Sequence, residues 1–126
     1  MKTVGIVGCE LIVGGFARAV KEKSSCRVLG FDRDESTLCL AELEKSIDGR
    51  LTKKNLAQCD IVIVALPPRA IAGFLREYGP FFGKKSFVVD CAGVKRAVCA
   101  EAWEIAGRCG FTFIGGHPMA GRERSG

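Results

Sequence analysis

The chain is poor in histidine, tryptophan and tyrosine, with one of each among 126 residues. It also lacks the spacings that bind zinc. None of its seven cysteines forms a Cys-x-x-Cys pair, and only His117 could join them as a ligand. We therefore expect no metal site. The number of cysteines is odd and most fall in apolar runs, so we interpret them as buried, reduced thiols of a cytoplasmic protein.

Long hydrophobic runs and clusters of one charge are missing too. No apolar stretch approaches the ~18 residues of a membrane span, and Gly5, Gly8 and Glu10 interrupt any apolar core of a secretory signal. We predict no membrane partner. The net charge is +5, but the basic residues are scattered in pairs, which disfavours nucleic-acid binding. A mild positive charge suits an anionic small molecule or cofactor.

Apolar, β-branched runs alternate with helical patterns along the whole chain. Asp34 is a plausible N-cap for one of the helices. The alternation predicts a single α/β domain, a doubly wound parallel sheet of the Rossmann-like, dinucleotide-binding type, with sites at the carboxyl ends of its strands. The segment 49–55 fits a short strand or a loop. The predicted strands are 2–7, 27–31, 61–65, 87–90 and 111–114, and the predicted helices are 11–23, 35–46, 70–78 and 94–109.

The first strand and helix frame a turn where dinucleotide folds carry Gly-x-Gly-x-x-Gly. Only Gly8 is in register, because Glu10 and Val13 occupy the second and third glycine positions. A carboxylate ~4 Å from a phosphate would repel it by up to about 4 kcal/mol, and less where solvent screens it. Val13 should push the helix outward unless Gly14 takes over the close contact. We expect weakened cofactor binding by a turn made of Gly8, Cys9, Glu10, Leu11 and Ile12.

Asp32 ends the second strand, 24 residues after Gly8. This is near the place of the acid that binds the adenosine ribose hydroxyls, and an aspartate there favours NAD. Arg33 beside it could hold the 2′-phosphate of NADP. The alternative for Asp32 is a turn residue or a helix cap, because Asp34 and Glu35 follow at once.

The single histidine, His117, lies in a glycine-rich stretch just after the last apolar run. Loops past the carboxyl end of a strand are where α/β proteins carry catalytic groups, and the pKa of histidine lies near neutrality. A loop histidine satisfied by backbone is the alternative. The stretch reads Gly115-Gly116-His117-Pro118-Met119-Ala120-Gly121.

With these pieces in place, the chain resembles the prephenate/arogenate dehydrogenase family. The resemblance implies oxidation of prephenate or arogenate with NAD or NADP. Hydride leaves the carbon that bears the ring hydroxyl, the ring carboxylate departs as carbon dioxide, and His117 takes the hydroxyl proton. The segments that carry the resemblance are 4–8, 30–33, 64–69, 90–96 and, most specifically, 115–126.

The resemblance also assigns roles outside the first turn. It places Ala65, Leu66 and Pro67 beside the ribose and nicotinamide of the cofactor. Gly93 stands near the substrate, where many family members have a serine, and Lys95 either touches substrate or cofactor or is a solvated lysine at a helix start.

Family enzymes continue into a helical domain that dimerises and supplies basic residues for the substrate carboxylates. This chain ends at Gly126. We therefore expect an incomplete dinucleotide-binding domain over 1–126, a homodimer only with the helical domain, and little activity alone. One alternative is a non-catalytic Rossmann-like remnant with impaired nucleotide binding. Another is a dehydrogenase of β-hydroxyacids, which the position of His117 after the sixth strand argues against.

Overall fold

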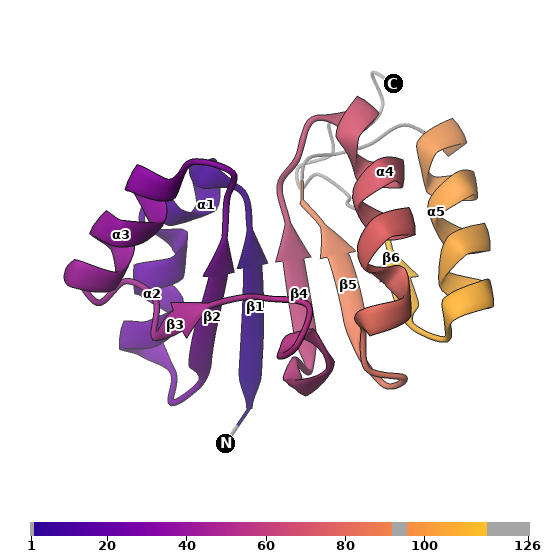
Figure 1. Cartoon of the computed structure of the whole chain (residues 1–126). Helices are drawn as coiled ribbons and strands as arrows, with labels where there is room; N and C mark the ends of the chain where they lie inside the picture. The colour runs from indigo at the N-terminus through magenta and orange to yellow at the C-terminus, as the bar shows by residue number, and fades with distance from the viewer. Residues whose placement is uncertain (1, 92–95, 116–126) are drawn as a thin grey trace.

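The computed structural model describes residues 2–91 and 96–115. Their strands form one parallel sheet in the order β3-β2-β1-β4-β5-β6 (Figure 1). This order reverses between β1 and β4, so the prediction of a doubly wound sheet is confirmed. The strands are β1 (Thr3–Val7), β2 (Arg27–Phe31), β3 (Gly49–Arg50), β4 (Ile61–Val64), β5 (Phe87–Asp90) and β6 (Thr112–Ile114).

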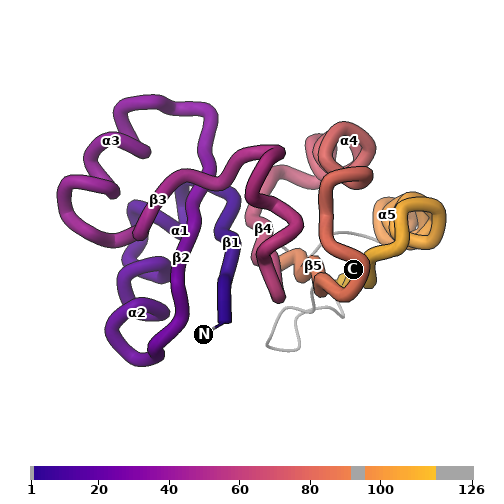
Figure 2. Tube along the Cα trace, turned by 60° about the horizontal axis from the view of Figure 1, so that its bottom comes forward, coloured from indigo at the N-terminus to yellow at the C-terminus, as the bar shows by residue number. Residues whose placement is uncertain are grey.

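Helices cover the sheet from both sides, and Figure 2 separates α4 and α5 from α2 across it. Residues of α1, α2 and α3 contribute to one apolar core, and residues of α4 and α5 to the other. The helices are α1 (Cys9–Val13), α2 (Phe16–Lys23), α3 (Glu35–Leu43), α4 (Pro68–Tyr78) and α5 (Arg96–Cys109), with single 3-10 turns η1 (Leu56–Gln58) and η2 (Gly79–Phe81).

The two cores follow from the period-two alternation of the central strands. In β1, Val4 and Ile6 enter the core of α1–α3, whereas Val7 enters the core of α4 and α5. Towards β6, the sheet face that α1–α3 cover near β1 is more open to solvent, since Phe87 and Ile114 on this face are 48% and 45% exposed. The described sheet is therefore most firmly held at β1 and β4, where the cleft described below begins.

The predicted helix over 11–23 was wrong as a single element. It is two helices, because Gly14 ends α1 and Gly15 takes a left-handed conformation with φ 93° before α2. A residue with a Cβ rarely adopts that conformation. In α3 the N-cap prediction is confirmed, since the Asp34 carboxylate accepts a hydrogen bond from the Ser36 N–H.

The cysteines depart from the prediction of buried thiols. Only Cys59 and Cys99 are buried, whereas Cys9, Cys39 and Cys91 are exposed. Apolar neighbours in sequence do not bury a side chain that faces outward on its helix or loop, which is why the composition misled. All seven are free. Burial raises the pKa of the Cys59 thiol to about 11.

Candidate functional site

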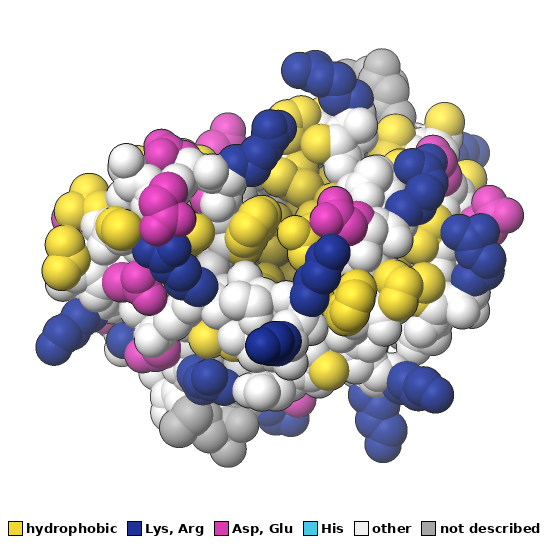
Figure 3. Space-filling view, in the orientation of Figure 1, with side chains coloured by type: hydrophobic (Ala, Val, Ile, Leu, Met, Phe, Trp, Pro, Cys, Tyr) yellow, Lys and Arg dark blue, Asp and Glu magenta, His cyan; other side chains and the backbone are white. Residues whose placement is uncertain are grey.

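A cleft of about 1070 Å³ opens at the carboxyl ends of β1 and β4, where the strand order reverses. Ligands of open α/β sheets bind at this point. Figure 3 shows a hollow with a hydrophobic floor and Lys and Arg side chains near its margin. The lining residues are Val7, Gly8, Cys9, Glu10, Phe31, Asp32, Arg33, Asp34, Ala65, Leu66, Pro67, Pro68, Arg69, Ala70, Gly73, Phe74, Glu77 and Tyr78.

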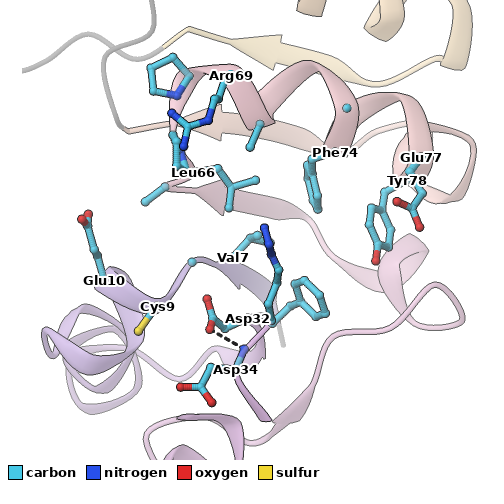
Figure 4. A pocket seen from close by; sticks show the side chains of 18 residues that line it. Val7, Cys9, Glu10, Asp32, Asp34, Leu66, Arg69, Phe74, Glu77 and Tyr78 are labelled. Atoms are coloured by element: carbon cyan, nitrogen blue, oxygen red, sulfur yellow. Dashed lines mark hydrogen bonds between the residues drawn. The ribbon is translucent and has the colours of Figure 1, made fainter. Parts of the chain in front are cut away.

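The cleft has two walls. We call residues 8–10 and 32–34, which follow β1 and β2, the first wall. Residues 65–78, which follow β4 and include α4, form the second wall. The close-up in Figure 4 shows side chains of both walls facing the space between them.

Gly8 joins the two walls at the bottom of the cleft. Its φ is +126°, and a Cβ added to it would lie 2.5 Å from the Ala65 carbonyl oxygen. Its N–H donates to the carbonyl of Phe31 at 3.0 Å. No side chain fits this position, so the backbone approaches the cleft as closely as the first glycine of a dinucleotide turn requires.

The rest of the predicted turn divides between the cleft and the core. Cys9 and Glu10 line the cleft, and Glu10 points away from Asp32 and Asp34 in Figure 4. Leu11 packs against the core of α1–α3, and Ile12 is 5% exposed within it. The structure therefore brings three of the five predicted turn residues to the cleft, Gly8 with its backbone and Cys9 and Glu10 with their side chains.

The expectation that Val13 would push α1 away from the sheet was wrong. Val13 is 69% exposed and does not lie between the helix and the sheet. Ile12 occupies that position instead and lies near Gly30 of β2, where an added Cβ would meet Ile47 at 2.9 Å and Ile12 at 3.4 Å. The third glycine position of the turn therefore makes no close contact with the sheet.

Asp32 is half-buried at the end of β2, and its Oδ2 accepts the Asp34 N–H at 2.8 Å (Figure 4). This is the turn contact that the sequence left open as an alternative. Both oxygens of Asp34 are engaged with Ser36 and Thr37 at the start of α3. Asp32 Oδ1 makes no hydrogen bond within the described residues, so one carboxylate oxygen faces the cleft lining without a partner there.

The second wall contains Ala65, Leu66 and Pro67, the residues that the resemblance assigns to the cofactor, and also aromatic residues that sequence reasoning missed. Pro68 stands at the first position of α4, where its fixed φ favours helix formation. Phe74 and Tyr78 lie one turn apart on α4 with ring centroids 4.8 Å apart. Their i, i+4 spacing was the signal that could have found them.

A smaller recess of about 240 Å³ continues from the cleft behind the aromatic rings. Lys53 stands at its rim, 5.2 Å from the centre of the Tyr78 ring, and pairs with Glu77 at 3.3 Å. This cation is therefore held by protein groups and is not directed to the cleft. The recess adds apolar surface to the end of the cleft at which Tyr78 lies.

At the end of β5, Asp90 is completely buried and Cys91 is exposed. Although Cys91 is exposed as a residue, the surrounding protein partly shields its sulfur from water, which raises the pKa of the thiol. The nearby negative charges of Asp90 and Glu10 raise it further. A raised pKa leaves less thiolate at neutral pH, which argues against a reactive cysteine. Glu10 therefore lies near enough to the end of β5 to affect its charge balance.

Three predicted residues fall outside the part of the chain that the structure describes. They are the catalytic candidate His117 and the substrate candidates Gly93 and Lys95. Among the described residues, no group of three or more His, Cys, Asp or Glu could hold a metal ion. None of the helices in this part is long and apolar enough to cross a membrane.

Comparison with known proteins agrees with the Rossmann-like fold. Residues 16–126 match the family described as "Prephenate dehydrogenase, nucleotide-binding domain". The chain belongs to this family. The match begins at residue 16, after the turn in which Glu10 and Val13 replace two glycines of the fingerprint.

Relatives and solved structures extend over almost all of the chain. Prephenate dehydrogenase of Lactococcus lactis is 31% identical over 100% of this chain and 36% of its own length, so the chain spans about a third of that relative. Synechocystis arogenate dehydrogenase has a TM-score of 0.79 and 28% identity, over 94% of this chain and 41% of that one. Aquifex aeolicus prephenate dehydrogenase in complex with hydroxyphenyl propionate and NAD+ has a TM-score of 0.78 and 25% identity, covering 96% and 43%.

The alternative of a β-hydroxyacid dehydrogenase has a counterpart in the fold. Mycobacterium tuberculosis 3-hydroxyisobutyrate dehydrogenase has a TM-score of 0.79 but is 15% identical, over 91% of this chain and 40% of that one. This likeness is one of fold alone. The family match favours the prephenate dehydrogenases over that alternative.

Proposed function

We propose that this chain is the cofactor domain of an NAD(P)-dependent oxidoreductase of tyrosine biosynthesis, which converts prephenate or arogenate by oxidative decarboxylation. The observation that carries the proposal is the cleft in which Gly8 and Asp32 follow the neighbouring strands β1 and β2. Membership of the prephenate dehydrogenase family supports it. Its seven free cysteines suit a reducing compartment, and we propose the cytoplasm as its location.

The described residues fit a dinucleotide at three points. A Cβ would fill the close approach at Gly8, Asp32 keeps one carboxylate oxygen for a ribose hydroxyl, and Leu66 offers an apolar contact from the second wall. The nicotinamide ring would accept the hydride. An aspartate at this position favours NAD, whereas the exposed Arg33 could bind the 2′-phosphate of NADP.

In this proposal His117 acts as the base that takes the hydroxyl proton, and Gly93 and Lys95 stand on the substrate side. A neutral imidazole within hydrogen-bond reach of the hydroxyl suits that role. In this reaction the carbon bearing the hydroxyl would lose hydride to the cofactor, and the hydroxyl would lose its proton to the base. The carboxylate would leave as carbon dioxide, with its bonding electrons passing into the ring. The ring oxygen would then regain a proton, so that the ring becomes a phenol. Substrate carboxylates and homodimer formation would depend on a further helical domain.

Two measurements test the proposal. Calorimetric titration of the chain with NAD and NADP should show binding, with NAD favoured. For catalysis, the chain would replace the matching first third of Lactococcus lactis prephenate dehydrogenase, and prephenate-dependent NADH formation would be followed. A His117→Gln variant of this chimera should lose most of the rate while keeping its affinity for NAD. Retention of the full rate by that variant would contradict the role of His117.

A non-catalytic remnant with impaired nucleotide binding is the second candidate. The observation that favours it is Glu10, an exposed carboxylate in the first turn of α1, where the fingerprint has a glycine. If neither NAD nor NADP binds at millimolar concentration to the folded chain, this second candidate replaces the first.

A further inference from the structure

The first wall offers little positive potential to a phosphate. Helix α1 has only five residues and ends at Gly14, so few peptide dipoles align behind its start. Glu10 stands in its first turn and adds a negative charge there. In an intact dinucleotide turn, a longer helix and a bare glycine face the pyrophosphate instead. A dinucleotide bound here therefore needs a cation from another part of the cleft.

Arg69 supplies such a cation from the second wall. It lies in the first turn of α4, is exposed and lines the cleft. Within the described residues its guanidinium forms no ion pair. Its neighbour on the same helix, Arg76, is held by Glu101 on α5, and Lys53 is held by Glu77. Arg69 is thus a cation of α4 that faces the cleft without a protein partner in the described part of the chain.

The position of Arg69 matches the place where a pyrophosphate would lie. Gly8 and Ala65 are in close contact across the ends of β1 and β4, so Glu10 and Arg69 follow adjoining strand ends. In Figure 4, Arg69 and Glu10 stand on opposite walls at the same end of the cleft, away from Tyr78.

The other cation of the lining has a different place in the sequence. Arg33 directly follows Asp32, the candidate for the adenosine ribose, at the end of β2. It is therefore suited to the ribose or a 2′-phosphate. Arg69, which follows β4, is the cation left for the bridge between the two halves of a dinucleotide.

We infer that Arg69 binds the pyrophosphate of the dinucleotide and replaces the contribution that the altered glycine turn has lost. The guanidinium can donate two parallel N–H bonds to phosphate oxygens and is always charged. Its charge also offsets that of Glu10 across the cleft. The inference rests on the proposed function and adds to it a specific phosphate-binding residue.

The test compares a ligand with phosphates to one without them. NAD and adenosine are titrated into the wild-type chain and into the Arg69→Gln, Arg69→Lys and Arg76→Gln variants, by calorimetry and by chemical-shift changes. Arg69→Gln should weaken NAD binding about tenfold, as expected for one charged hydrogen-bonding group. It should leave adenosine binding within about twofold and reduce the dependence of NAD affinity on salt. Arg69→Lys should recover part of the loss.

Arg76→Gln is the matched control, because it removes the same charge from the same helix outside the cleft lining. It should leave both affinities unchanged. The inference is overturned if Arg69→Gln binds NAD as the wild type does, if it weakens adenosine equally, or if Arg76→Gln has the same effect. If the wild-type chain binds neither NAD nor adenosine, that result would instead overturn the proposed function.

Discussion

The two walls of the cleft reach the same ligand space with opposite chemistry. The first wall carries the carboxylates Glu10, Asp32 and Asp34 beside one cation, Arg33, and the Asp34 N–H within it donates to the Asp32 carboxylate. The second wall is built mainly on a regular helix of 11 residues, which presents Arg69 and the neighbouring rings of Phe74 and Tyr78. The first wall contains the turn that carries the glycine fingerprint in other dinucleotide folds. In this chain it is therefore less favourable for binding an anion than the second wall.

This difference indicates how a binding site can tolerate a damaged motif. Gly8 keeps the one feature of the turn that no other residue can replace, which is the close approach of backbone to backbone. The position of a positive charge is less restricted, because a long side chain from the opposite wall can also reach the phosphate. We therefore expect the largest effect on NAD binding from a substitution that disturbs the backbone at Gly8. Loss of the Asp32 carboxylate should have a smaller effect, and a change of charge at Glu10 a smaller one still.

The largest effect should come from Gly8→Ala. The added Cβ would lie 2.5 Å from the Ala65 carbonyl oxygen at a φ of +126°, so the ends of β1 and β4 must separate. We expect a loss of about 3 kcal/mol in the free energy of unfolding, measured by urea denaturation, together with loss of NAD binding. Gly73→Ala is the control on the second wall, where an added Cβ meets nothing within 4 Å. It should stabilise the chain by about 0.5–1 kcal/mol.

Asp32→Asn comes next, with an expected tenfold loss of NAD affinity by calorimetry. The amide oxygen can still accept the Asp34 N–H, so the turn is kept while the charge that favours the ribose hydroxyls is removed. NADP affinity should fall less, because Arg33 remains. Asp34→Asn is the matched comparison: it keeps the helix cap, since asparagine caps helices as well as aspartate, and it removes a negative charge from the same wall, so it should not lower either affinity. Equal losses in both variants would show that Asp32 acts only through the turn.

The comparison also explains what could be predicted from the sequence. The strand at 61–64 follows from a β-branched run and the strand at 27–31 from a short apolar run that ends at Asp32. Asp34 has the residue type and position of an N-cap. The break at Gly15 could not be read, because a left-handed glycine and a helical one look alike in a sequence. Nor could the position of Arg69 opposite Glu10, because it depends on the crossover that places β4 beside β1. Residues that follow one strand were predictable, and contacts between strand ends were not.

Glu10→Gly should have a smaller effect of the opposite sign. We expect NAD to bind about three- to fivefold more tightly, because the repulsion is removed but was already screened by solvent at an exposed site. Glu10→Gln separates charge from the volume of the side chain and should give most of the gain. Val13→Gly should give none, because Val13 is 69% exposed and does not hold the helix away from the sheet. A gain from Val13→Gly alone would mean that the helix start has been misplaced.

The smallest effects should be seen in cysteine alkylation, which samples both sides of the cleft without changing the sequence. Cys9 lines the first wall, so saturating NAD should slow its reaction with iodoacetamide a few-fold, whereas the exposed Cys39 outside the cleft lining should react at the same rate with and without NAD.

Cys91 has a raised pKa, chiefly because the protein partly shields its sulfur from water, so its thiolate is scarce at neutral pH and its rate of alkylation should increase as the pH rises. Because the charge of Glu10 contributes to that shift, Glu10→Gln should move the pH profile of Cys91 to lower pH. An unchanged profile would mean that the charge of Glu10 does not act on the thiol at the end of β5.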